Sequence, residues 1–490
     1  MKVRITLTAI MILAILFPAK AQNPDDALRY SRQFYSGTAR FSAMGGAFTA
    51  LGGDLSAIGL NPAATGVFRR SEFSFTPHIG YTNTSTIFTS TSDDLRYNFT
   101  IGQFGFIMPL TEQGNESGLI SANFGYSYNQ NNNFNTNTVI RGVNSTSSMA
   151  DYWAATSNGT LYTNLSGTQA LAYDAWLIDT ISGTGALQYG TVFSRYGDQA
   201  STYGQDVRRV ITNEGASGEH SFSLGANFNN NLFVGATLGI SRFSYTGHYE
   251  HLETDPQNAI FDFNSFSYVD HFEADGMGFN LKAGLIYIPA DFIRLGAAIH
   301  SPTVYKVKEY YYDDLTSTFD DGSRYEFSSD AFRFNYRLTT PFRAMAGAAI
   351  QIQKFALLSF DYEYLDYSIA RFSKASDGYD YYNENQAIRD IYKSAHNFRA
   401  GAEYRLGMLY LRGGYGYYGK AFSAAEPNSD TFHSTVSGGL GIRQSNFFFD
   451  LGFSKLQSTE KYFMYNHENV DPVTISTAKN NFQATIGFRF

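Results

Sequence analysis

The chain has 490 residues, with 36 Lys or Arg against 44 Asp or Glu, and this net charge of −8 argues against a nucleic-acid partner. It contains no cysteine, so no disulfide framework stabilises it. Charged residues make up 16% of the chain, below the roughly 25% of soluble domains, while Phe, Tyr and Gly are abundant. This composition favours an all-β barrel in an outer membrane over a secreted soluble β-sandwich or propeller.

Residues 1–21 have the pattern of a secretory signal peptide. Lys2 and Arg4 give a basic start, residues 5–17 are mostly apolar, and Ala19-Lys20-Ala21 offers a cleavage site. The alternative, an uncleaved membrane anchor, is disfavoured because the apolar stretch is too short to span a bilayer. The sequence therefore predicts an exported protein whose mature chain is more acidic than the full one.

Residues 22–71 do not alternate as strands do. Within this segment Phe41, Met44, Phe48 and Leu51 follow helical spacing, and the small-residue stretch GGDLSAIGLNPAATG at 52–66 follows. The segment is too small to form its own core, so it must pack against other parts of the protein. We expect it to plug the lumen of a barrel as an N-terminal hatch with short helices.

The last ten residues, NFQATIGFRF, alternate strictly between apolar and polar side chains and end on Phe490. Ten residues are about the length of one tilted transmembrane strand. The same alternation recurs at 396–405, 436–443 and 447–453, with Arg, Glu and Asp on the face opposite the apolar residues. Apolar outside and charged inside is typical of a membrane barrel and the reverse of a soluble one.

Alternation predicts fourteen strands within residues 72–490, separated by short turns and long loops in alternation. The expected strand starts lie near residues 72, 97, 118, 219, 231, 277, 292, 333, 355, 396, 408, 432, 446 and 480. Short periplasmic turns and long extracellular loops are typical of outer-membrane barrels. The predicted fold is thus a transmembrane antiparallel β-barrel of fourteen strands.

The longest expected loop, an extracellular insertion at about 130–218, opens with an Asn-rich run and then changes character. Both tryptophans of the protein, Trp153 and Trp176, lie in it among other apolar residues, which predicts one or two short helices. Two interpretations stay open. The insertion either packs on itself as a cap over the barrel mouth or forms an apolar groove where a hydrophobic ligand lands.

The stretch SAMGGAFTALGGDLSAIGLNPAATG, residues 42–66, resembles the N-terminal hatch of the FadL/TodX (OMPP1) family of outer-membrane transporters. Asn61, Pro62 and Ala63 match the family's hatch motif, although Ala64 stands where the family usually has Gly. Further resemblance lies at 295–307, 341–350, 358–368, 396–418 and 435–454, but it does not extend through 130–218. It implies a monomeric fourteen-stranded barrel, closed by its hatch, in the outer membrane of a Gram-negative bacterium.

The resemblance also implies passive uptake of long-chain fatty acids or other hydrophobic compounds, with lateral escape into the outer leaflet. We expect ligand contacts from hatch residues Phe41, Met44, Phe48 and Leu51 together with a luminal arginine, Arg399 or Arg412. Outer-membrane lipid surrounds such a barrel, and the barrel-assembly machinery reads an ending like Phe490. No enzyme, cofactor or metal site is expected, because no catalytic constellation appears and the nine histidines are scattered.

Three alternatives remain. The barrel could be a scaffold or shuttle that binds a secreted protein through the 130–218 insertion. Less favoured is a haem receptor, since scattered histidines do not exclude haem ligation. A non-selective porin is disfavoured because the expected hatch fills the lumen.

Overall fold

The computed structural model describes residues 23–110, 117–181, 187–197, 200–465 and 470–490. The signal peptide expected at 1–21 lies outside these residues. Within the described ranges no helix is both long and apolar enough to cross a membrane.

The wall is one antiparallel sheet in which each strand pairs with its neighbours along the chain, and β21 pairs back with β1. Its strands are β1 (Glu72–Ile87), β2 (Thr91–Pro109), β3 (Leu119–Asn133) continued by β4 (Thr136–Asn144), β7 (Gln205–Phe228), β8 (Leu232–Thr254), β9 (Ser265–Ala290), β10 (Ile293–His300) continued by β11 (Val304–Thr318), β13 (Phe332–Thr339) continued by β14 (Arg343–Ile352), β15 (Ala356–Asp366) continued by β16 (Arg371–Ser373), β17 (Ser394–Leu406), β18 (Leu409–Tyr418), β19 (His433–Arg443), β20 (Phe447–Tyr462) and β21 (Val473–Arg489). Among the described residues β12 (Arg324–Ser328) pairs only with β11, so the wall they form has fourteen strands, and the predicted closed barrel is confirmed.

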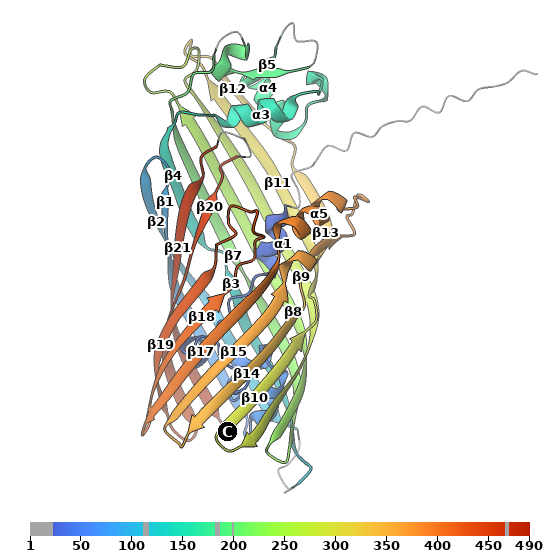
Figure 1. The fold of residues 1–490 in the computed structure, drawn as a ribbon, viewed down its shortest axis with the longest axis vertical. Coiled ribbons are helices and arrows are strands. Elements are labelled where there is room, and N and C mark those ends of the chain that lie inside the picture. The colour runs from blue at the N-terminus through green and yellow to red at the C-terminus, as the bar shows by residue number, and fades with distance from the viewer. Residues whose placement is uncertain (1–22, 111–116, 182–186, 198–199, 466–469) are drawn as a thin grey trace, which may run out of the picture.

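The barrel has two unlike ends (Figure 1). At the turn end, strands are joined by a few residues, as at 229–231, 353–355 and 407–408; at the loop end, long segments join them. Several strands extend further toward the loop end than alternation predicted: β7 begins at Gln205, β9 at Ser265 and β21 at Val473. Alternation marks only the part of a strand whose outer side chains are apolar, whereas the backbone ladder continues beyond it.

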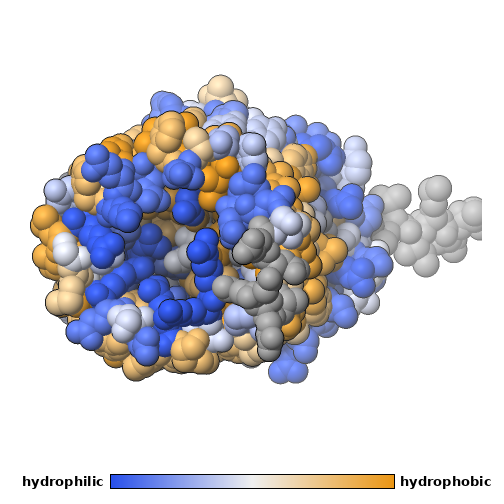
Figure 2. All heavy atoms as spheres, turned by 90° about the horizontal axis from the view of Figure 1, so that it is seen from below, coloured by the Kyte–Doolittle hydropathy of each residue, from blue (hydrophilic) through white to orange (hydrophobic). Residues whose placement is uncertain are grey.

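Side-chain direction along the strands matches the expected pattern. On β21, Phe482, Ile486 and Phe488 are 50%, 41% and 48% exposed on the outer face, while Gln483 and Thr485 are buried on the inner face. Seen from the turn end, hydrophilic residues gather in a central hollow within a ring of hydrophobic ones (Figure 2). An apolar outer band around a polar interior suits a barrel surrounded by lipid.

Residues 23–68 lie inside the barrel and contain α1 (Pro24–Ser31), α2 (Ala39–Ala43) and the 3₁₀ helices η1 (Leu55–Gly59) and η2 (Pro62–Val67). Their backbone hydrogen-bonds to inward side chains all around the wall. The wall partners include His78 on β1, Asn123 on β3, Lys282 on β9, His300 on β10, Ser437 on β19 and Thr485 on β21. A segment that touches strands on every side of a closed ring lies within it, which supports the hatch expected at 22–71.

The loop end carries a small helical cap on the strand tips. It consists of α3 (Met149–Ser157), η3 (Tyr162–Asn164), α4 (Gly167–Asp174), β5 (Ile178–Thr180), β6 (Tyr189–Thr191) and η4 (Val192–Gly197). Trp153 is fully buried in the core that the cap shares with β7, β9 and β11, whereas Trp176 is 49% exposed. Strand pairing between β4 and β7 extends into both ends of the segment 130–218 that was expected as a loop. Two further helices, η5 (Tyr367–Ile369) and α5 (Tyr382–Ile391), lie beside β16.

One seam interrupts the wall. The ladder between β2 and β3 covers only 103–109 of β2, and among the described residues nothing pairs with that edge of β2 from 91 to 102. At this height β3 and β4 keep their ladder with β7, but they have no ladder with β2. The β4 strand lies against the inner face of β1. The hydroxyls of Thr82 and Thr86 donate to the carbonyls of Asn135 and Val139, 3.0 and 2.6 Å away. The barrel wall is therefore weakest between β2 and the β3–β4 strand.

Candidate functional site

The turn-end half of the lumen is closed by ion pairs. The Glu363 carboxylate, fully buried, accepts hydrogen bonds from the guanidinium groups of Arg343 and Arg399 at 2.7 and 2.9 Å. Nearby, Glu403 binds Arg412 from β18 and Arg40 from α2. The second of these pairs attaches the N-terminal segment directly to the wall, so the same network that stiffens the strands also holds the plug.

The Asn61-Pro62-Ala63 motif makes a close junction between plug and wall. The Asn61 side-chain amide donates to the carbonyls of Thr49 and Leu285 at 2.6 and 3.1 Å, and its oxygen accepts from the Ala63 N–H at 3.0 Å. A Cβ at Gly284 would lie 1.9 Å from the Asn61 Oδ1. Glycine in the wall thus lets the motif approach the strand backbone.

Asp54 organises the plug internally. Its carboxylate accepts hydrogen bonds from the Thr38 hydroxyl at 2.8 Å and from the Ser56 N–H at 3.0 Å, so it caps η1 and ties that helix to the start of α2. Burial raises the pKa of the Asp54 carboxyl, and the neighbouring Arg40 charge opposes that rise. The plug is therefore a structured unit with its own polar interior rather than a loose filler.

The predicted ligand contacts lie in this sealed half. Phe41, Met44, Phe48 and Leu51 are at most 3% exposed and form one apolar cluster with wall residues of β10 and β14. Arg399 and Arg412 are 1% and 7% exposed and engaged by carboxylates. None of the six lines the cavity on the loop side of α1, so their contact with ligand stays a prediction that requires the plug to move.

A second luminal region lies on the loop side of α1: a cavity of about 370 Å³, in the size range of small-molecule sites. We call it the upper cavity. Its lining combines many apolar or aromatic side chains with four cations and two carboxylates. The apolar or aromatic members are Leu28, Phe34, Phe134, Ile211, Tyr245, Tyr249, Phe422, Leu456, Tyr462 and Ile475; the charged members are Asp25, Arg29, Arg32, Glu460, Lys461 and Lys479.

The cations of the upper cavity are set among rings. The Arg29 guanidinium carbon lies 4.3 Å from the centre of the Tyr245 ring, and that of Arg32 lies 5.9 Å from the Phe422 ring. Arg29 also pairs with Asp26, whose carboxyl pKa is raised by burial and lowered in part by that arginine. Arg32 forms no ion pair within 4.0 Å with any described residue, although its charge acts on the Glu460 carboxyl that lines the same cavity.

Sequence reasoning missed the upper cavity because its lining comes from segments far apart in the chain. A usable signal existed in residues 24–34, PDDALRYSRQF, where two arginines alternate with Leu, Tyr and Phe. Lys479 is a second signal, since a cation occupies a lumen-facing position of the last strand. Neither signal identifies a cavity without the register of the strands.

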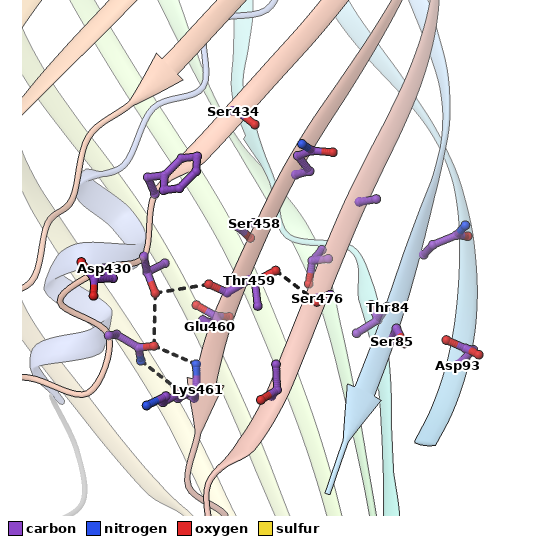
Figure 3. A pocket seen from close by; sticks show the side chains of 18 of the residues that line it. Thr84, Ser85, Asp93, Asp430, Ser434, Ser458, Thr459, Glu460, Lys461 and Ser476 are labelled. Carbon is purple, nitrogen blue, oxygen red and sulfur yellow. Dashed lines mark hydrogen bonds between the residues drawn. The ribbon is translucent and has the colours of Figure 1, made fainter. Parts of the chain in front are cut away.

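A larger groove of about 1070 Å³ adjoins the upper cavity. Figure 3 shows that β1, β20, β21 and the segment around Asp430 border it. Asn428 bridges this segment to the Lys461 backbone, and the Thr431 hydroxyl donates to the Thr459 carbonyl at 3.3 Å. Most of its lining residues are Ser, Thr, Asn, Asp or Glu, but the surface that they present to the groove is more apolar than polar.

The structure has counterparts among solved structures, although no protein-family model and no curated protein matches the sequence. A FadL homologue from Pseudomonas aeruginosa is 13% identical, with 94% of this chain and 100% of that chain covered and a TM-score of 0.57. The toluene transporter TodX from P. putida is 13% identical, with 93% and 99% covered and a TM-score of 0.54. The toluene transporter TbuX from Ralstonia pickettii is 15% identical, with 93% and 99% covered and a TM-score of 0.50.

This chain has the FadL fold. The resemblance found in the hatch motif is confirmed at the level of architecture and over nearly the full chain. At 13–15% identity the likeness shows the fold alone, so what the FadL-like barrel does here must be argued from its own cavity and seam.

Proposed function

We propose that this protein is an outer-membrane channel for passive uptake of hydrophobic compounds, with long-chain fatty acids as the favoured class. The observation that carries the proposal is the upper cavity, which joins an apolar, aromatic lining to four cations, of which Arg32 forms no ion pair with a described residue. A neutral hydrocarbon needs only the first feature. A fatty acid uses both, because its chain packs on the rings while a guanidinium holds its carboxylate.

The proposed route begins at the loop end and avoids the sealed turn end. A ligand enters the upper cavity from outside, where its apolar area leaves water at a gain of about 25 cal/mol per Å². It then leaves sideways through the seam between β2 and the β3–β4 strand, where no ladder has to break. Residues 39–67 keep the turn end closed, so uptake is diffusion down a gradient without an open aqueous pore.

The same proposal covers targeting and assembly. Residues 1–21 direct export, the hatch at 22–71 and the barrel at 72–490 form the mature monomer, and the insertion at about 130–218 faces the cell exterior. Phe490 is 76% exposed at the turn end, where the assembly machinery of a Gram-negative outer membrane would reach it. The channel catalyses no reaction and needs no cofactor.

Mass spectrometry of the protein purified in a short-chain detergent tests the proposal. We expect one fatty acid or hydrocarbon per barrel, and ligand-specific uptake by liposomes that contain the protein. A co-purifying secreted protein without lipid would favour the shuttle alternative, for which exposed Trp176 and Phe261 on the loop end offer a surface. High ion conductance with no bound ligand would contradict both.

A further inference from the structure

The outer face of the barrel carries a cluster of cations on four strands, β8, β11, β13 and β16, with β9 between β8 and β11. We call it the basic patch. Its members are Arg242, Lys306, Lys308, Arg333, Arg337 and Arg371. Their side chains point outward, because the residues beside them in each strand, such as Phe243, Val307 and Leu338, are buried in the interior.

Strand register brings these cations close together. Lys306 stands directly opposite Arg337 across the β11–β13 ladder, and like charges so placed repel one another. Arg242 and Lys306 both stand opposite Met277 of β9, so they lie two strand spacings apart, about 10 Å. One row across the sheet therefore contains Arg242, Met277, Lys306 and Arg337 in that order, with three positive charges.

The basic patch lacks internal neutralisation. None of its six cations forms an ion pair within 4.0 Å with any described carboxylate, although Asp275 stands opposite Lys308. The luminal arginines differ: Arg40, Arg343, Arg399 and Arg412 are each engaged by Glu or Asp. These four inward charges are matched by carboxylates, whereas no described carboxylate lies within 4.0 Å of any of the six outward cations.

The patch has a defined height on the barrel. The next row toward the turn end contains Phe279 and Val304, which are 50% and 42% exposed, and exposed Leu281, Leu295 and Ile299 continue the apolar band below them. The patch lies at the edge of the apolar band that is nearer the loop end. Because the proposed orientation turns the capped loop end to the cell exterior, this is the extracellular edge of the band. Cations at that edge lie at the depth of the outer-leaflet headgroups.

We propose that the basic patch binds a phosphate-bearing lipid headgroup of the outer leaflet, while the lipid's acyl chains pack on Phe279, Val304 and Ile299. The inference rests on the proposed location in the outer membrane. Phosphate suits this arrangement because guanidinium groups bind its oxygens in pairs, and one multivalent anion relieves the repulsion between Lys306 and Arg337. A soluble anion would leave the adjoining apolar surface without a partner.

The test compares two double variants of the full chain in phosphatidylcholine nanodiscs that contain a minor fraction of bis-phosphorylated lipid A. Lys306→Gln with Arg337→Gln neutralises the patch. Lys455→Gln with Lys420→Gln removes two cations near β20, on the far side of the barrel. Native mass spectrometry after detergent extraction counts the retained lipid. We expect the patch variant to retain the lipid roughly 30-fold less, because each cation near an anionic surface contributes about fivefold to binding.

Equal lipid retention by the patch variant and the wild type would overturn the proposal, as would equal retention of dephosphorylated lipid A. Wild-type retention should fall at about 1 M salt, where screening acts over only about 3 Å, and this readout stands even if a variant fails to fold. Fatty acid bound to the protein in the same mass spectra tests the proposed transport function independently of the patch. Fatty acid without lipid A overturns the patch alone, and lipid A without fatty acid overturns transport alone.

Discussion

The two halves of the lumen are built on opposite rules. In the turn-end half, small residues pack beside buried carboxylate–guanidinium pairs, as with Glu363 between Arg343 and Arg399. In the loop-end half, aromatic rings surround a cavity in which Arg32 forms no ion pair with a described residue. A satisfied buried polar network makes a structure rigid, whereas a charge without a close partner can gain from binding a ligand. The seal and the proposed binding region therefore lie at different heights of one barrel.

Removal of Glu363 should break the sealed half most severely. The Glu363→Ala change leaves two buried guanidinium groups without their carboxylate, and the expected loss is about 3–5 kcal/mol of unfolding free energy. Urea unfolding in lipid vesicles measures this. As a control, Glu326→Ala removes an exposed pair with Arg324 and should cost less than about 1 kcal/mol. Equal losses for both variants would mean that the luminal network contributes no special stability.

A methyl group at Gly284 should displace the plug. The Cβ of Gly284→Ala would lie 1.9 Å from the Asn61 Oδ1, so either the motif or β9 must shift, at a cost of about 3 kcal/mol, the upper end of usual overpacking penalties. Planar-bilayer recordings should show increased ion leak. Gly413→Ala is the matched control, because no atom lies within 4 Å of a Cβ there. If the Gly284→Ala barrel shows no more ion leak than the wild type, Asn61 is not part of the seal.

The sequence predicted the wall better than the site. Alternation in segments such as 481–490 records which side chains face lipid, so it specifies strand number and direction. The same signal fades beyond the apolar band, which is why β7, β9 and β21 were expected to start too late. The upper cavity depends on long-range register, since α1, β8 and β21 are brought together only by closure of the ring. Local patterns carry no record of that closure.

Replacing Asn61 should loosen the plug more mildly. Asn61→Ala leaves the carbonyls of Thr49 and Leu285 without this donor, with an expected cost of about 1–2 kcal/mol. Uptake and leak conductance measured together identify the role of the motif. Leak with normal uptake would make Asn61 a fixed tie, whereas lost uptake without leak would make it a latch that moves during transport.

The smallest expected effect on stability, and the most informative about ligand, comes from Arg32 in the loop-end half. Arg32→Gln should leave the unfolding free energy within about 0.5 kcal/mol, because the side chain forms no ion pair with a described residue. Its affinity for a fatty acid should fall roughly tenfold, since a charge-assisted hydrogen bond to the carboxylate is lost. Affinity for toluene, which has no carboxylate, should stay unchanged.

Fluorescent fatty-acid displacement on purified barrels gives both affinities. Arg405→Gln is the control, because this exposed arginine lies at the turn end and donates to the Gly407 carbonyl at 3.0 Å, far from the upper cavity. A parallel drop for fatty acid and toluene would show that Arg32 shapes the cavity rather than holding an anion. An unchanged fatty-acid affinity would mean that Arg32 does not bind the carboxylate. The carboxylate would then bind Lys479 or Arg29, or the upper cavity would bind ligands through apolar contacts alone.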